Sequence, residues 1–144
     1  MNDMERLRQW YEALRENDLD TVLGSLSPQL EWREAEGHPY QPSGQPWFGP
    51  EAVRDNLFAN LSLHWADFTV APHSFHDAGG TIVVEGRYTG TFRANGRRLD
   101  AQFCHIWQVE DGKLARLQQY TDTAQLLATT RVQFSALNEL MSAL

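Results

Sequence analysis

The chain has little cysteine, little positive charge and no long apolar run. Its single cysteine, Cys104, excludes an internal disulfide and a metal site built from several cysteines. A net charge of −7 disfavours nucleic acid and anionic membrane surfaces as partners. No apolar segment has the length of a membrane span, and Met1 precedes a polar helix rather than a signal peptide. We therefore expect a cytoplasmic protein that binds neither nucleic acid nor membrane.

The length and composition are typical of one globular domain. At 144 residues the chain can bury a sizeable core, and its hydrophobic fraction of 42% is ordinary. It has no internal repeat and no low-complexity segment. We expect a single domain over residues 1–128 and a helical extension over residues 129–144, where apolar residues recur at helical spacing from Leu137 to Leu144.

The first half of the chain is predicted to be mainly helical. Apolar residues at spacings of three and four predict a helix over residues 3–16. Asp18 or Asp20 can cap a second helix, which is expected to end at Ser27 and Pro28.

A strand, a loop and a third helix follow. Residues 29–34 are expected to form a short strand, and residues 35–50 a long loop rich in glycine and proline. Loops of this length are usually functional or mobile. Pro50 suits the first turn of the third helix. Residues 65–76 are expected to be extended, with an edge or a bulge at Pro72.

Residues 81–122 are the most informative segment, because two turns divide them into three antiparallel strands. The turns are Asn95-Gly96 and Asp111-Gly112, dipeptides that are favoured where φ must be positive. The expected pairs across the turns are Ala94 with Arg97 and Glu110 with Lys113. This register determines which side chains share a face of the sheet.

One face of this three-stranded sheet is predicted to be mostly apolar and aromatic. Its members are Val84, Gly86, Tyr88, Gly90, Phe92, Leu99, Ala101, Phe103, His105, Trp107, Val109, Leu114, Arg116, Gln118, Tyr120 and Asp122. In this register His105 lies opposite Gly86, which leaves a gap, and shares the face with Asp122. An apolar wall with a gap and a few convergent polar groups is typical of a small-molecule pocket.

The candidate catalytic residues are Asp122, His105 and Glu34. A carboxyl group in an apolar cavity is costly to ionise and therefore suits proton abstraction next to a carbonyl near neutral pH. His105 could donate to a developing enolate oxygen or exchange a proton with Asp122. The structural alternatives are a helix cap for Asp122, a buried His105 bonded to Gln118 or Tyr88, and an exposed carboxylate for Glu34.

The candidate ligand-binding residues are aromatic or carry an amide. They are Trp32, Phe58, Tyr88, Phe103, Tyr120 and Gln118. Such a surface suits a flat ring ligand. No metal and no other cofactor are expected, because Gly37 and Pro39 interrupt the strand that would align Glu34, Glu36 and His38.

The order of the elements and three short motifs resemble a known family. The motifs are Leu-Glu-Trp-Arg-Glu at 30–34, Asp-Gly-Lys at 111–113 and Gln-Tyr-Thr-Asp at 119–122. They resemble the SnoaL-like and ketosteroid-isomerase-like proteins of the nuclear transport factor 2-like superfamily. The resemblance implies an α+β fold, in which a cone-shaped, curved antiparallel sheet is wrapped by three N-terminal helices and followed by a C-terminal helical tail.

The resemblance also bears on individual residues. Glu34 falls at the position of the isomerases' general base, and His105 near their second carboxylic acid, which donates to the oxyanion. The first-helix tyrosine of the isomerases falls near Trp10 or Tyr11. The pairing of Asp122 with His105 is closer to the polyketide cyclases, in which an aspartate serves as acid and base.

The family also implies a homodimer. The opposite face of the three strands is mixed, neither apolar enough for a core nor polar enough for bare solvent. Its predicted members are Glu85, Arg87, Thr89, Thr91, Arg98, Gln102, Ile106 and Leu117. A dimer interface would explain this composition.

The sequence thus favours a small cofactor-independent enzyme with a hydrophobic carbonyl compound as its ligand. Asp122 would act as acid and base and His105 as oxyanion donor, in an isomerase, cyclase or dehydratase (lyase) reaction. The alternative is a non-catalytic module of the same fold that binds an apolar small molecule or mediates dimerisation.

Overall fold

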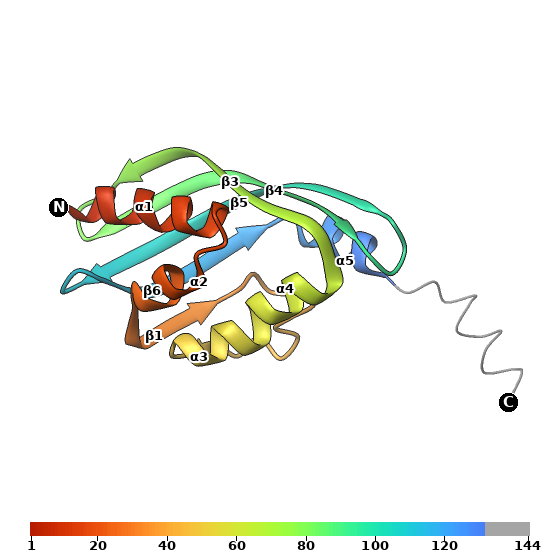
Figure 1. Ribbon diagram of the computed structural model, residues 1–144, viewed down its shortest axis with the longest axis horizontal. Helices are drawn as coiled ribbons and strands as arrows, with labels where there is room; N and C mark the ends of the chain where they lie inside the picture. The colour runs from red at the N-terminus through yellow and green to blue at the C-terminus, as the bar shows by residue number, and fades with distance from the viewer. Residues whose placement is uncertain (132–144) are drawn as a thin grey trace, which may run out of the picture.

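A computed structural model of the chain describes residues 1–131, and the apolar positions from Leu137 to Leu144 lie outside this part. The elements are α1 (Asp3–Arg15), α2 (Leu19–Gly24), β1 (Leu26–Arg33), β2 (Trp47–Phe48), α3 (Pro50–Val53), the π-helical turn η1 (Arg54–Phe58), α4 (Ala59–His64), β3 (Trp65–Asp77), β4 (Thr81–Phe92), β5 (Arg98–Glu110), β6 (Lys113–Thr121) and α5 (Thr123–Thr130). Helices lie over one face of a curved sheet (Figure 1). The predicted α+β fold is confirmed.

The strands form one six-stranded sheet in the order β2-β1-β6-β5-β4-β3. Strand β1 pairs with β6 in parallel, and all other neighbours are antiparallel. The sheet is therefore mixed rather than wholly antiparallel as predicted. A parallel pair needs a long connection, and nearly the whole domain lies between β1 and β6.

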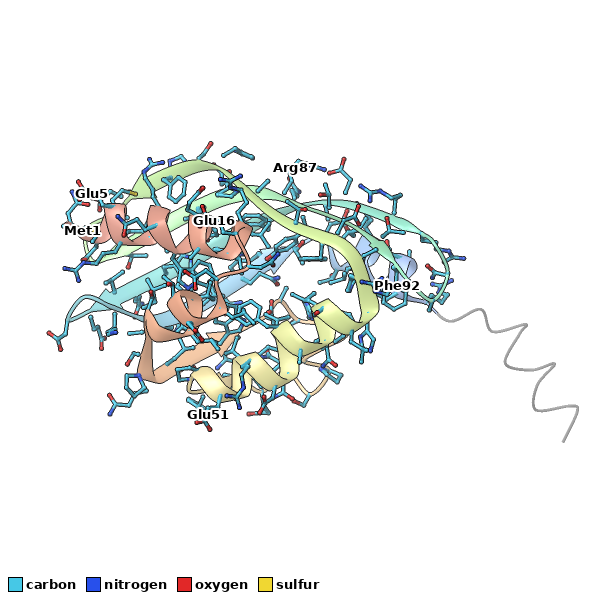
Figure 2. All side chains as sticks on the ribbon, in the orientation of Figure 1. Met1, Glu5, Glu16, Glu51, Arg87 and Phe92 are labelled. Carbon is cyan, nitrogen blue, oxygen red and sulfur yellow. The ribbon has the colours of Figure 1, made fainter. Side chains whose placement is uncertain are left out.

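The helices begin where capping residues precede them. Asn2 and Glu5 form a reciprocal capping box at the start of α1, whose buried face carries Leu7, Trp10 and Tyr11. Asp18 caps α2, as predicted. That helix ends earlier than expected, and Ser27 and Pro28 belong to β1. Acidic side chains of α1 and α3 face solvent, among them Glu5 and Glu51 (Figure 2).

The turn between β4 and β5 is longer than the predicted two-residue turn. The Phe92 N–H donates to the carbonyl of Arg97 at 2.9 Å, so the loop holds four residues, 93–96. Pairing along β4 and β5 consequently shifts by two positions, which preserves the predicted faces. His105 lies opposite Val84, and Gly86 opposite Phe103. A Cβ at Gly86 would overlap the Phe103 ring, so the glycine accommodates this ring rather than leaving a gap beside His105.

The turn between β5 and β6 is as predicted, but a bulge follows it. Asp111 and Gly112 both have positive φ, at 51° and 74°. Val109 pairs with Leu114, whereas Gln108 pairs with Arg116, so Ala115 is one extra residue on β6. A shift of one residue exchanges the two faces of a strand for every residue beyond it.

The remaining strand and the third helix agree with expectation. The pairing of β3 with β4 is interrupted between Pro72 and Ser74, where a bulge was expected. Pro50 opens α3, and the π-helical turn η1 continues it into α4. No helix within residues 1–131 is long and apolar enough to cross a membrane.

Candidate active site

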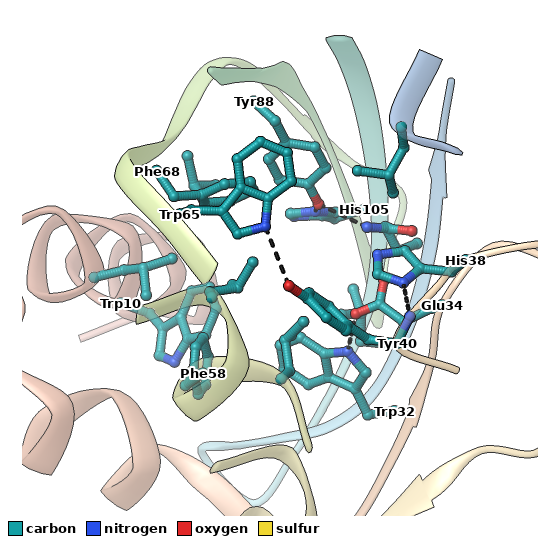
Figure 3. A pocket seen from close by; sticks show the side chains of 17 residues that line it. Trp10, Trp32, Glu34, His38, Tyr40, Phe58, Trp65, Phe68, Tyr88 and His105 are labelled. Carbon is teal, nitrogen blue, oxygen red and sulfur yellow. Dashed lines mark hydrogen bonds and ion pairs between the residues drawn. The ribbon is translucent and has the colours of Figure 1, made fainter. Parts of the chain in front are cut away.

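A cavity of about 50 Å³ lies between the helices and the inner face of the sheet. Its lining residues are Trp10, Leu14, Trp32, Glu34, His38, Tyr40, Leu57, Phe58, Leu61, Trp65, Phe68, Val70, Tyr88, His105, Leu117, Gln119 and Leu126. The wall is mostly apolar and aromatic. Glu34, His38 and His105 lie on one side of it, and Trp10 and Phe58 on the other (Figure 3).

Glu34 directly follows β1 and is 4% exposed. The indole N–H of Trp32 donates to its Oε1 at 2.9 Å. Its Oε2 is buried and has no hydrogen-bond partner within the described part of the chain. Burial raises the pKa of the Glu34 carboxyl to about 7, and the bond from Trp32 opposes this only in part. The Glu34 carboxyl thus combines a pKa near neutrality with one oxygen that has no hydrogen-bond partner in the described part of the chain.

His38 lies beside this free oxygen. The backbone N–H of Tyr40 donates to its Nδ1 at 3.1 Å, which places the proton of the neutral imidazole on Nε2. Nε2 lies 3.8 Å from Oε2 of Glu34, too far for a direct hydrogen bond. Burial lowers the pKa of His38 to about 4, so the ring is neutral at pH 7. It thus offers an N–H donor next to the carboxyl group without neutralising it.

The loop that carries His38 is tied to the site at two points. The Gln41 side chain accepts from the Glu34 N–H at 3.0 Å and donates to the Trp32 carbonyl at 3.2 Å. The Tyr40 hydroxyl bonds to Nδ1 of His64 at 2.8 Å. It also accepts from the Trp65 indole at 3.2 Å (Figure 3). These bonds hold the loop over the cavity in a defined conformation.

A second polar group of the cavity is centred on His105. The hydroxyl of Tyr88 lies 2.5 Å from its Nε2, and the hydroxyl of Tyr11 lies 2.6 Å from its Nδ1. The Trp107 indole donates to the Tyr11 oxygen at 2.9 Å, and the Gln119 amide donates to the Tyr88 oxygen at 3.0 Å. Residues from α1, β4, β5 and β6 are thereby joined in one network.

The available donors and acceptors determine which atom carries the proton in each hydrogen bond of this network. Tyr11 is 3% exposed, and its hydroxyl has no acceptor within residues 1–131 other than Nδ1 of His105. Tyr11 therefore donates to Nδ1, and the Nε2–H of His105 donates to Tyr88. The Tyr88 oxygen then accepts from both His105 and Gln119, which leaves its own O–H for an acceptor in the cavity.

Burial keeps the whole network uncharged. It lowers the pKa of His105 to about 3 and raises the pKa of Tyr11. Burial also raises the pKa of Tyr88 well above its ordinary value, and the nearby Glu34 carboxylate raises it further. Tyr88 is therefore a neutral hydrogen-bond donor whose oxygen already accepts two bonds, an arrangement that stabilises negative charge developing on an acceptor.

One protein family matches most of the domain. The SnoaL-like domain family matches residues 7–117. The chain belongs to this family. Comparison with curated proteins found no match.

Solved structures share the fold of this chain. An NTF2-like protein from Burkholderia thailandensis has a TM-score of 0.85 at 26% identity, covering 92% of this chain and 99% of its own. An NTF2-like protein of unknown function from Burkholderia pseudomallei has a TM-score of 0.82 at 30% identity, with the same two coverages. TerC, co-crystallised with polyporic acid, has a TM-score of 0.77 at 24% identity and covers 88% of this chain and 96% of its own.

Five of the predicted site residues line the cavity of this SnoaL-like chain. They are Glu34, His105, Trp32, Phe58 and Tyr88. Phe103 was expected to touch the ligand, but it does not line the cavity. Its ring stacks on His105 and Tyr88, with centroids 4.0 and 4.6 Å apart, and it supports both from behind.

Three more predicted site residues do not line the cavity, because the bulge at Ala115 reverses the faces of β6. Gln118 and Tyr120 point to the outer face, and Tyr120 is 54% exposed. Asp122 is exposed and caps α5, where its side chain accepts from the Gln125 N–H at 3.0 Å. The predicted pair of Asp122 and His105 is therefore not formed.

The same bulge brings residues into the cavity that the sequence placed elsewhere. Gln119 takes the position predicted for Gln118, and Leu117 lies inside rather than on the outer face.

His38 also lines the cavity, although the sequence suggested it only as a metal ligand. Among residues 1–131 the structure holds no group of three or more histidine, cysteine, aspartate or glutamate side chains suited to a metal ion.

Proposed function

We propose that this SnoaL-like protein is a cofactor-independent enzyme that moves a proton on a small, largely apolar carbonyl compound. Glu34 is the acid–base residue, and Tyr88 is the donor to the carbonyl oxygen. The observation that carries the proposal is the pairing, in one apolar cavity, of a carboxyl group with an unbonded oxygen and a tyrosine with an unused O–H.

The proposed reaction is an enolisation. The Glu34 carboxylate removes a proton from the carbon next to the carbonyl group, and the electron pair moves to the carbonyl oxygen. The Tyr88 O–H donates a hydrogen bond to the oxygen as its negative charge develops. Glu34 then returns the proton to the same or to another carbon, which completes an exchange or an isomerisation. A base with a pKa of about 7 suits this task near neutral pH.

The cavity limits the size and polarity of the substrate. A volume of about 50 Å³ suits a compact molecule, since one water needs about 10–15 Å³ on the same measure. The walls from Trp32, Phe58 and Trp65 favour an apolar or ring-shaped body. Among the relatives of this fold, TerC was crystallised with a small molecule, polyporic acid. A larger guest would have to displace the loop held by Tyr40.

Proton exchange in D₂O tests the proposal directly. Small cyclic ketones and β,γ-unsaturated ketones are incubated with the protein, and loss of α-proton NMR signals is followed. We expect the Glu34→Gln variant to lose the exchange and Tyr88→Phe to slow it by about 10²- to 10³-fold. Asp122→Asn is the matched control, because asparagine still caps α5 and the residue lies outside the cavity. Loss of exchange in Asp122→Asn with retention in Glu34→Gln would contradict the proposal.

The non-catalytic alternative has a distinct signature. Both ring nitrogens of His105 are already bonded, which also fits a cavity that only holds a ligand. In that case the ketones would bind, as followed by chemical-shift changes, without protein-dependent exchange at any pH. Binding without exchange would support the alternative and overturn the enzymatic proposal.

We propose in addition that the protein forms a homodimer through the outer face of its sheet. Tyr120 on this face is 54% exposed, and Ile106 and Cys104 beside it are only partly buried. Light scattering should give twice the chain mass of 16.5 kDa, and Tyr120→Glu should shift the protein towards the monomer. A monomer at all concentrations would contradict this.

A further inference from the structure

A second cavity, of about 250 Å³, lies at the other end of α1. Side chains and backbone of α1, α2 and the β5–β6 turn line it: Met1, Arg6, Gln9, Trp10, Thr21, Gly24, Ser25, Val109, Gly112, Lys113 and Leu114. Among these residues two are cationic and none carries a carboxylate. A cationic cavity is unexpected in a chain of net charge −7.

The two cations of this cavity lack counter-charges. Neither Arg6 nor Lys113 forms an ion pair with any residue of the described range 1–131. The Nε atom of Arg6 is buried and has no hydrogen-bond partner in the same range. Leaving a buried charged donor unpaired is costly, and a negative charge in the cavity would supply the counter-charge that the guanidinium lacks.

The local backbone positions the guanidinium group of Arg6. Gly112 has a φ of +74°, and a Cβ at this residue would overlap Nη1 of Arg6. The β5–β6 turn therefore lets the guanidinium lie directly against it. Lys113 follows in the chain and donates from Nζ to the Gly24 carbonyl at 2.6 Å, which occupies one of its three protons. Both cations retain donors for a ligand.

We propose that this cavity is a binding site for a compact oxyanion, a small molecule that carries a carboxylate or a phosphate group. Arg6 would hold the anionic group through its guanidinium N–H donors, and Lys113, which lines the same cavity, would add its charge. Arginine is well suited to both kinds of oxyanion because its planar donors match their oxygens. The inference is independent of the reaction proposed for the first cavity.

Trp10 connects the two cavities. This residue lines both, and its indole N–H donates to the Val22 carbonyl at 3.0 Å, which holds the ring in place. An occupant of the second cavity would therefore lie against a residue that also forms part of the wall of the first. The Trp10 indole N–H signal in an NMR spectrum is a local reporter of binding, separate from any activity.

Titration of the intact chain with anions tests the site. Sodium phosphate, succinate and acetate are added at constant ionic strength, with sodium chloride as the reference, and calorimetry and indole N–H shifts are recorded. We expect a Kd of about 1 mM or tighter for at least one oxyanion, a shift of the Trp10 signal, and weakening at higher salt. Preference between phosphate and succinate identifies the anionic group.

Matched variants separate this site from general charge effects. Lys113→Gln changes an exposed side chain and should raise the Kd for the bound oxyanion at least about tenfold. Arg6→Gln should raise this Kd by a similar factor. Arg93→Gln, at an exposed cation in the β4–β5 loop, should leave it unchanged. If Arg6→Gln fails to fold, Lys113→Gln alone decides. No binding up to about 10 mM, or equal weakening in Arg93→Gln, would overturn the proposal.

Discussion

Replacing Glu34 with glutamine should change how the free energy of unfolding depends on pH. The unfolded chain releases this proton near the ordinary pKa of 4.5, whereas the folded protein retains it up to about 7. Between these values the folded state binds more protons, so its stability falls as the pH rises. Each pH unit contributes about 1.4 kcal/mol, and the interval therefore costs the wild-type protein about 3 kcal/mol.

Glutamine has a similar shape, can still accept from Trp32 and has no proton to lose. The stability difference between Glu34→Gln and the wild-type protein should be constant below about pH 4.5. It should grow by about 1.4 kcal/mol per unit towards pH 7, and level off at about 3 kcal/mol above its acid value. Because every other titrating group is common to both proteins, its contribution cancels.

Urea unfolding from pH 4 to 8.5 measures this difference. Glu36→Gln serves as the control, since it removes an exposed carboxyl group of the same loop without altering the cavity. A Glu34→Gln difference that is equal at pH 5 and pH 8 would refute the reasoning, because the buried carboxyl group would then titrate as it does in the unfolded chain. The base proposed for the reaction would be lost with it.

Three further outcomes are expected. The His105 contribution to stability should be lost on acidification: its pKa falls from 6.5 to about 3 on folding, so up to about 5 kcal/mol is lost between these pH values, measured as the pH-dependent difference in urea unfolding between the wild-type protein and His105→Gln; a difference that does not change with pH would contradict this. Gly86→Ala should cost about 1–3 kcal/mol in thermal unfolding, because the added Cβ overlaps the Phe103 ring; an unchanged Tm would contradict this. Tyr11→Phe leaves Nδ1 of His105 and the Trp107 N–H without their partner and should cost about 1–3 kcal/mol in urea unfolding; nitrogen NMR of the wild-type protein should show the proton of His105 on Nε2, and a proton on Nδ1 would contradict the proton assignment.

Local signals in the sequence were sufficient for most of the fold. The apolar spacing of α1, the cap at Asp18 and the Asp111-Gly112 turn each depend on a few neighbouring residues, and all are found as predicted. The family motifs supplied the arrangement of these elements. The longer turn before β5 did not disturb the faces, because a shift of two residues preserves them.

The site was harder to predict, because it depends on one residue and one loop. Ala115 carries none of the glycine or proline signals that mark irregular backbone, yet the bulge there moves Gln119 inward and Tyr120 outward. The position of the bulge depends on how β6 pairs with β1 and β5 in the folded sheet. The loop that carries His38 is held by Gln41, whose bonds to Trp32 and Glu34 follow from contacts formed only in the folded chain.

The charge states of Glu34 and His105 have one physical cause, the absence of solvent around both side chains. The same burial raises the pKa of Glu34 and lowers the pKa of His105, so that both groups can be uncharged at neutral pH. An imidazolium at His105 would put a positive charge in the same cavity as Glu34 and would lower the pKa of its carboxyl group. A neutral His105, bonded on both sides by tyrosines, instead fixes the orientation of the Tyr88 hydroxyl without adding charge. The cavity therefore holds two groups with different titration behaviour. The Glu34 carboxyl has a pKa near 7, whereas the Tyr88 hydroxyl stays protonated at that pH. An acid–base reaction requires such a pair.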